Sequence, residues 1–330
     1  MTASATALRL RPYADEADVV EIVRLVNANN RADGVDERWT VGSLTSWFEH
    51  PTETFDARRD AVIGELDGRP VAAGALEWVD TRDGLHREYR FWGAVEPDLR
   101  GQGIGSALLA RHERRARELA AEQRPSRQPV LGTFVPVGRP AEALMRAAGY
   151  EAARWFFEMV RPTLGEIQLT PMPDGLELRP VTPAQHPAVW RANREAFRDH
   201  WGGSDESPEA MDRLLADPDT DPSLWVIAWD GDEVAGGIWN DIYPEENADL
   251  GIRRGWLGSV FTRRPWRGRG LARGLIGRSL ELLRERGMTS AALGVDADNP
   301  TGALGLYEAA GFTVHDRACA MRKPMSGATP

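Results

Sequence analysis

The feature that most restricts how this 330-residue chain can fold is that its sequence repeats itself once. Four landmarks occur twice in the same order: an alternating Leu-x-Leu-Arg-Pro segment, an Asp-Gly pair between apolar runs, an arginine followed by a glycine-rich segment, and an Ala-Ala-Gly-aromatic end. The landmarks begin at Leu8, Asp67, Arg100 and Ala147, and again at Leu176, Asp230, Arg267 and Ala309. Four matches in one order indicate a duplication, and this length suits two domains.

The joint between the halves is expected near residues 163–175, where Pro171 and Pro173 interrupt a stretch without periodicity. We therefore expect an N-terminal domain over residues 1–165 and a C-terminal domain over residues 175–330. Asp-Gly between apolar runs favours a tight β-hairpin. Each half then has the order strand, helices, hairpin, strand, glycine-rich turn, helix, strand, helix. This order predicts the α/β class, with a mixed, mostly antiparallel sheet flanked by helices.

Composition narrows the classes of function. The formal net charge of −10 disfavours nucleic-acid binding, which usually needs a basic face. Cys319 is the only cysteine, so an intramolecular disulfide and a cysteine-rich zinc site are excluded, and the six histidines have no metal-ligand spacing. There is no signal-peptide core and no membrane-spanning apolar run. We expect a cytoplasmic protein without a metal; its oligomeric state is left open.

Two glycine-rich turns are the strongest indication of a ligand site in this sequence. The second glycine loop, Arg267–Gly270, lies between an expected strand over residues 257–261 and an expected helix over residues 271–285. Such a turn directs backbone N–H groups and the positive end of the helix dipole at one point, which suits a phosphate. The first glycine loop, Arg100–Gly103, repeats this arrangement. Neither loop ends in Gly-Lys-Ser/Thr, and a hairpin precedes both, which disfavours nucleotide P-loops and dinucleotide folds.

At these residues the chain resembles a known family. Arg-x-x-Gly-x-Gly/Ala after a strand is similar to the pyrophosphate-binding motif of the GNAT superfamily of N-acetyltransferases. In the second half, Asp298-Asn299-Pro300 and the segment 306–312 resemble that family's closing motif. The tandem arrangement is similar to the mycothiol-synthase type and to related actinobacterial acetyltransferases. The resemblance implies acetyl-CoA as co-substrate and acetyl transfer to an amine.

The resemblance also implies roles for individual residues. The acetyl and pantetheine arm of acetyl-CoA would contact Val260, Phe261, Thr262 and Asn299. The pyrophosphate would be held by Arg267, Gly268, Arg269, Gly270, Leu271, Ala272 and Arg273, and the terminal phosphate would meet residues 263–266. The matching positions of the first half are Gly93, Ala94, Val95, Arg100, Gly101, Gln102, Gly103, Ile104, Gly105 and Ser106.

The catalytic acid is expected in the second half alone. Tyr307 matches the family tyrosine that protonates the departing thiolate. The first half has Met145 at the equivalent position, and methionine cannot donate a proton. Residues 136–140 also lack the asparagine found at position 299. We therefore expect the C-terminal domain to be catalytic, and the N-terminal domain to be non-catalytic, with or without bound CoA.

The general base stays open at the level of sequence. Relatives of the mycothiol-synthase type often carry a glutamate on the strand before the glycine loop, where this chain has Trp256. The candidates are Asp241, Glu245, Glu246 and Asp249, or water. The segment 199–203 is a candidate for the amine pocket. The leading hypothesis is acetylation of a primary amine on a small molecule. The alternatives are acetylation of a cysteinyl amine, as in mycothiol synthesis, and a catalytically silent CoA-binding sensor or scaffold.

Overall fold

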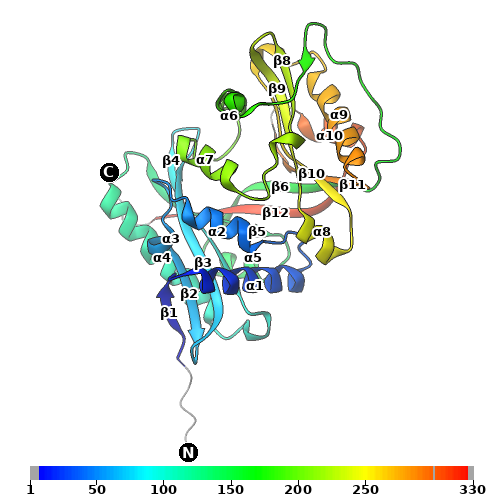
Figure 1. Ribbon diagram of the computed structural model, residues 1–330. Coiled ribbons are helices and arrows are strands. Elements are labelled where there is room, and N and C mark those ends of the chain that lie inside the picture. Colours follow the sequence, from blue (N-terminus) through cyan, green and yellow to red (C-terminus); the bar gives the residue numbers. More distant parts are fainter. Residues whose placement is uncertain (1–6, 300–301, 326–330) are drawn as a thin grey trace, which may run out of the picture. The chain divides into compact units, whose positions relative to one another are not determined.

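The computed structural model describes residues 7–299 and 302–325, which form two compact units (Figure 1). Unit 1 contains the chain up to Ala153, the segment Trp201–Asp217 and the chain from Cys319 onward. Unit 2 contains Arg154–His200 and Pro218–Ala318. In the described ranges, every helix is too short or too polar to cross a bilayer.

Unit 1 contains six strands of sheet. The sixth is the C-terminal part of the last strand of the chain, from Cys319 onward. The order is β1-β2-β3-β4-β5-β12. The strands β1 to β4 pair antiparallel, and β4 and β5 pair parallel. The strands are β1 (Arg9–Pro12), β2 (Ala61–Leu66), β3 (Arg69–Asp80), β4 (His86–Val95), β5 (Gln128–Pro136) and β12 (Thr313–Pro324). The helices are α1 (Glu16–Asp33), α2 (Val41–Glu49), α3 (Ala57–Asp60), η1 (Pro97–Leu99), α4 (Ile104–Gln123), α5 (Pro140–Ala147) and α7 (Pro208–Ala216).

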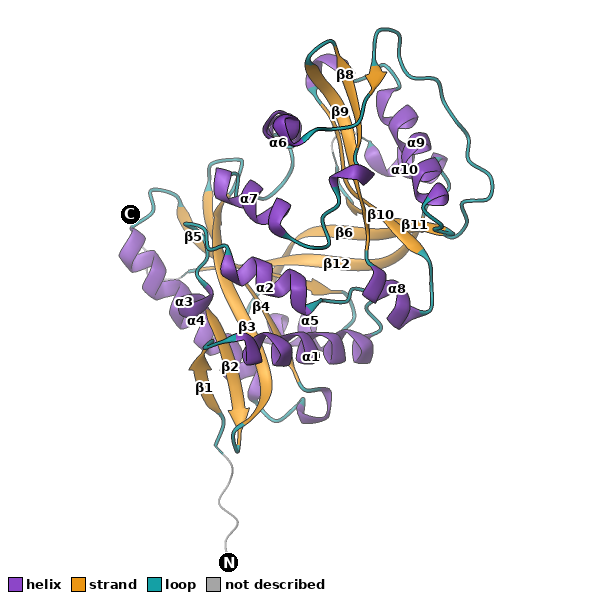
Figure 2. Ribbon diagram, viewed as in Figure 1, coloured by secondary structure: helices purple, strands orange, loops and turns teal. Residues whose placement is uncertain are grey.

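Alternation along β3 places helices on both faces of this sheet (Figure 2). Ala73 and Ala75 pack in one core cluster with residues of α1, such as Ile22. Ala72, on the opposite face, packs with Ile104 at the start of α4. Because successive strand residues point to opposite faces, one strand contributes to both cores. The sheet therefore carries α1 on one face and α4, the helix after the first glycine loop, on the other.

Unit 2 has the same plan. Its strand order is β6-β11-β10-β9-β8-β7, with β10 and β11 parallel and the other pairs antiparallel. The strands are β6 (Glu151–Arg161), β7 (Glu177–Leu178), β8 (Val226–Asp230), β9 (Glu233–Ile242), β10 (Arg254–Thr262) and β11 (Ser290–Asp296). The helices are η2 (Pro183–Gln185), α6 (His186–Ala196), η3 (Pro222–Leu224), α8 (Pro244–Leu250), η4 (Arg264–Trp266), α9 (Leu271–Glu285) and α10 (Ala303–Ala309). The predicted α/β class with mixed, mostly antiparallel sheets is confirmed.

The two halves of the sequence exchange their last strands. Met159 on β6 comes from the first half but is fully buried in the core of unit 2. Cys319 and Met321 on β12 come from the second half but lie in the core of unit 1. The segment 162–176 that joins the halves has no helix or strand, yet its Leu164 is 2% exposed within the core of unit 2. The division into 1–165 and 175–330 stays a proposal about the duplicated sequence, since the compact units contain parts of both halves.

Candidate active site around the second glycine loop

The second glycine loop folds as a tight turn that leads directly into α9. Gly268 and Gly270 both have positive φ, +75° and +85°, a region that favours glycine because it has no Cβ. Gly270 is the N-cap of α9, so the loop ends where the helix begins, as the sequence predicts. A Cβ built on either glycine would meet no atom within 4 Å. The space in front of the loop is therefore open.

The amide groups of this turn are available to a ligand. The first N–H groups of a helix have no partner inside the helix. In the described part of the chain, no hydrogen-bond acceptor is found for the backbone N–H groups of residues 268–273. Together with the helix dipole, these donors make a site that fits a pyrophosphate.

The arginines around the loop have different contacts. Arg267 donates to the carbonyl oxygens of Thr262 (3.0 Å) and Ala196 (3.0 Å), and to Asp199 (3.3 Å). Its side chain thus ties the loop to the end of α6. Arg269 and Arg273 are exposed beside the open amides, where their charges can add to the attraction for a phosphate.

The flanking cluster over residues 263–266 is also partly committed to protein contacts. Arg263 pairs with Glu195 (2.9 Å) and Glu233 (3.2 Å), and Trp266 donates its indole N–H to Asp230 (2.9 Å). Arg264 is 71% exposed and pairs with Asp199. Of the two arginines expected at the terminal phosphate of CoA, Arg264 is thus the more exposed.

The strand that leads to the loop contains a β-bulge. On β10, Leu257 pairs with Asn240 and Ser259 pairs with Trp239, so Gly258 is the extra residue. The parallel pairing with β11 covers only Arg254–Trp256. Within the described chain, the rest of β10, including Val260, Phe261 and Thr262, lies outside that pairing. Backbone groups of an unpaired strand edge can bind an extended amide chain such as a pantetheine arm.

Side chains from α6 and β9 surround the bulge. Asn193 on α6 is fully buried and donates to the hydroxyl of Ser259 (2.7 Å). Trp190 on α6 stacks on Trp239, with ring centroids 6.1 Å apart. At Gly258 a Cβ would overlap Oδ2 of Asp241 from β9. The sequence interpretation missed Asn193 and the role of Gly258; a glycine inside a strand pattern was the available signal for a bulge.

Tyr307 lies on α10, on the α9 side of the sheet. It is 6% exposed within the core cluster of unit 2, beside Phe312. Burial raises the pKa of its hydroxyl to about 12, so the group is protonated at neutral pH. Asn299 lies in the turn between β11 and α10, where its N–H donates to the carbonyl of Asp296 (3.1 Å). Pro300, the next residue of the closing motif, lies outside the described residues.

The carboxylates that were candidates for a base have different surroundings. Glu246 on α8 is 3% exposed and accepts from the indole N–H of Trp256 (3.0 Å) and from Arg254 (3.4 Å). Glu245 and Asp249 are exposed on the same helix. Of the four, Asp241 is the one whose carboxylate lies where a Cβ of Gly258 would be.

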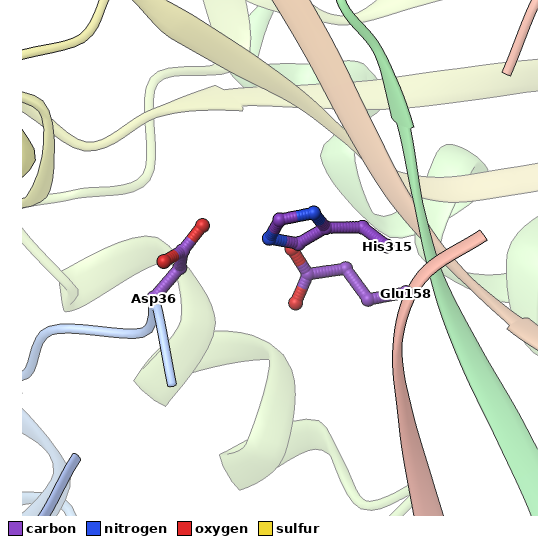
Figure 3. Close-up of side chains that lie close together, drawn as sticks. All are labelled: Asp36, Glu158 and His315. Carbon is purple, nitrogen blue, oxygen red and sulfur yellow. The ribbon is translucent and has the colours of Figure 1, made fainter. Parts of the chain in front are cut away.

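One further acidic side chain on this sheet was not among the sequence candidates. Glu158 on β6 lies 3.8 Å from Arg254. His315 on β12 is its neighbour, and the two side chains bring potential ligand atoms within 4.8 Å of each other (Figure 3). Glu158 escaped the sequence interpretation because it belongs to the first half, which gave no sign that its last strand completes the other unit.

The segment 199–203, expected near the amine pocket, is divided between the units. Asp199 pairs with Arg264 and Arg267 in unit 2, and these cations lower the pKa of its carboxyl. Trp201 belongs to unit 1, where the guanidinium of Arg322 lies 4.2 Å above its ring. A Cβ at Gly203 would overlap the backbone of Asp80, so the chain passes very close to β3 there.

The first glycine loop has nearly the same backbone as the second. Gly101 and Gly103 have φ of +76° and +84°, and a Cβ on either would meet nothing within 4 Å. In the described ranges, the N–H groups of residues 101–106 likewise have no acceptor. Arg100 pairs with Asp33 (2.7 Å) at the end of α1, as Arg267 reaches the end of α6. The expected acetyl-arm positions Gly93, Ala94 and Val95 lie at the end of β4.

Comparison with known proteins agrees with this geometry. The model of the acetyltransferase (GNAT) family matches residues 22–150 and 187–312, one region in each half. A protein named mycothiol acetyltransferase from Geodermatophilus obscurus is 31% identical over 309 residues, which cover 91% of this chain and 92% of that protein. Another of that name from Catenulispora acidiphila is 31% identical over 327 residues, 95% of this chain and 97% of that protein.

Solved structures give the same result. A GCN5-related N-acetyltransferase from Sphaerobacter thermophilus superposes with a TM-score of 0.69 at 27% identity, over 96% of this chain and 95% of that one. A tandem GNAT protein from the clavulanic acid biosynthesis pathway has a TM-score of 0.71 at 18% identity, over 98% of this chain and all of that one. At 18% identity, the likeness to the second structure shows a shared fold alone.

Proposed function

Because the chain belongs to the GNAT acetyltransferase family, we propose that its second half transfers the acetyl group of acetyl-CoA to a primary amine of a small molecule. The observation that supports this assignment is a combination found within unit 2. An open helix N-terminus follows a bulged strand, and a buried, protonated tyrosine lies on the same side of the sheet as that helix. Such a combination serves binding, positioning and proton donation at once.

The residues have distinct tasks in this proposal. Acetyl-CoA supplies an acetyl group activated as a thioester. The amides of residues 268–273 bind the pyrophosphate, with Arg269 and Arg273 adding charge, while Arg267 holds the loop to α6. The unpaired edge of β10 from Val260 to Thr262 aligns the pantetheine arm and the thioester carbonyl, and Asn299 contacts that arm. Tyr307 donates a proton to the departing sulfur.

The first half has a different task. Met145, at the position of Tyr307, is 7% exposed in the core of unit 1 and offers no proton. The first glycine loop keeps its open amides, so we propose that the first half contributes structure and, at most, binds CoA without turnover.

A second candidate function is acetylation of a cysteinyl amine. It is favoured by the relatives named mycothiol acetyltransferase, which match over more than nine-tenths of the chain. Trp256 argues against it, because it stands where relatives of that type often carry a glutamate.

The proposal is tested by a screen of amines in which the release of the CoA thiol is measured. Aminoglycosides, polyamines, amino acids and cysteinyl thiol precursors are each offered with acetyl-CoA, and the acetylated product is verified by mass. Turnover of non-thiol amines supports the leading proposal, and turnover of cysteinyl amines alone supports the second candidate. CoA binding without turnover of any amine would favour a sensor or scaffold.

A further inference from the structure

We infer that Asp241 is the general base that takes a proton from the amine substrate, an inference that rests on the acetyl transfer proposed above. Asp241 stands on β9 directly opposite Trp256 of β10, two residues before the bulged Gly258. Its Oδ2 lies where a Cβ of residue 258 would be. Only glycine at position 258 lets this carboxylate lie against the bulge.

The side of the sheet on which Asp241 lies is fixed by its neighbours. Asn240, the preceding residue, donates to Ser279 on α9 (3.1 Å), so Asp241 points to the opposite face. Trp239, two residues away, points to that opposite face as well and stacks on Trp190 of α6. Asp241 therefore faces the α6 side, whereas Tyr307 packs on the α9 side.

This arrangement places a base and an acid on opposite faces of β10. The amine adds to one face of the thioester carbonyl to give a tetrahedral intermediate, which then expels the sulfur as a thiolate. As the C–N bond forms, the nitrogen loses a proton to Asp241. As the C–S bond breaks, the sulfur takes the proton of Tyr307. One proton then passes from Asp241 to Tyr307 through solvent, so the products are the acetylated amine and the CoA thiol.

Several other charged groups on the α6 side contact one another. Arg254, which shares the face of Trp256, lies near Glu246 (3.4 Å) and Glu158 (3.8 Å). On α6, Arg194 donates to Asn193, and Glu195 pairs with Arg263 (2.9 Å). Tyr243 follows β9 and lies edge-on to Trp256. None of these carboxylates contacts the bulge as Asp241 does.

The test compares Asp241→Asn with Glu245→Gln, which removes a carboxylate exposed on α8. With the full chain and an amine that the wild type acetylates, D241N should lower kcat/KM by about a hundred- to ten-thousandfold, as expected for loss of general base catalysis. It should also flatten the dependence of kcat/KM on pH relative to that of the wild type. E245Q should keep both the rate and the pH profile. The affinity for acetyl-CoA, measured by calorimetry, should stay the same in both variants.

Two more variants separate catalysis from structure. Asp241→Glu keeps a carboxylate and should restore part of the rate, whereas Gly258→Ala should displace Asp241 and reproduce the loss seen in D241N. A D241N enzyme with an unchanged rate and pH profile would overturn the role of Asp241 and leave acetyl transfer intact. A wild type that acetylates no amine would overturn the proposed function itself, and the inference with it.

Discussion

The first and second glycine loops differ little in themselves, but the strands that lead into them differ clearly. The φ angles of the paired glycines agree within 1°. However, β4 runs beside β3 without a shift of register from residue 87 to 95, whereas β10 has a bulge at Gly258. β4 pairs with β5 over six residues, and β10 pairs with β11 over only three.

This difference separates binding of the phosphates from chemistry at the acetyl group. The phosphate cradle depends only on the glycine turn and the helix start, and both halves have them. A site for the thioester needs backbone groups that leave the sheet pairing early, and β10 provides more of them. The first half carries Glu77 opposite Arg90, at the register where the second has Asp241 opposite Trp256, but it has neither the bulge nor the tyrosine.

The largest expected effect comes from blocking the amides of one glycine loop at a time with a valine side chain. Gly270→Val places a side chain in front of the amides of α9 and should reduce acetyl transfer to background. Gly103→Val makes the same change at α4 and should leave most of the activity. Both positions have the same positive φ, so the strain, about 1–2 kcal/mol, should be equal in the two variants.

Thermal unfolding of the two variants is the control, since equal shifts would show that strain alone does not explain a difference in activity. Loss of activity in G103V with survival in G270V would move the active site to the first half. Equal losses would mean that both loops take part.

The next largest effect concerns α10 and α5, the helices that hold Tyr307 and Met145 at equivalent positions. Tyr307→Phe removes only a hydroxyl and should slow acetyl transfer by about ten- to ten-thousandfold, with acetyl-CoA affinity unchanged. Met145→Leu, at the equivalent position of the first half, should leave the rate within about twofold, because a volume-conserving core substitution costs little. Initial rates at saturating acetyl-CoA measure both. An unchanged rate in Y307F would mean that the sulfur takes its proton from water.

Much of this comparison could be predicted from the sequence, and the rest could not for identifiable reasons. The bounds of α9 follow from the glycine before Leu271 and the apolar periodicity after it, and the predicted range 271–285 is confirmed. The bulge at Gly258 depends on Asp241 from the neighbouring strand, which local sequence does not reveal. The contact of Arg267 with α6 joins residues 71 positions apart. The exchange of β6 and β12 depends on strand pairings between residues far apart in the sequence, such as that of β6 with β11.

The strand exchange predicts crossed effects on stability. Met159 and Met321 are both fully buried, but each lies in the unit formed mainly by the other half. Met159→Ala should cost about 2–5 kcal/mol of unfolding free energy and lower hydrogen-exchange protection in α9. Met321→Ala should do the same in α4. If M159A loosened α4 instead, the assignment of β6 to unit 2 would be wrong.

The smallest expected effect is a difference between α4 and α9 in how their stability depends on pH. His112 on α4 is 2% exposed and stacks on Phe91, and burial lowers the pKa of its imidazole to about 3. Ser279, eight residues after the start of α9 as His112 is after the start of α4, is also buried but does not titrate. In the unfolded chain the histidine has a pKa of about 6.5. Between these values the unfolded chain binds one proton more than the folded chain.

The free energy of unfolding therefore carries the full contribution of neutral His112 above about pH 6.5. It decreases as the pH falls toward 3, with a slope approaching about 1.4 kcal/mol per pH unit. We expect protection of α4, corrected for intrinsic exchange, to fall between pH 7 and 5 more than that of α9. His112→Gln removes the titration and should make the two helices respond alike, although its own packing cost lowers protection at every pH. If α4 of the wild type and of H112Q lost protection in parallel, another group would carry the acid sensitivity of unit 1.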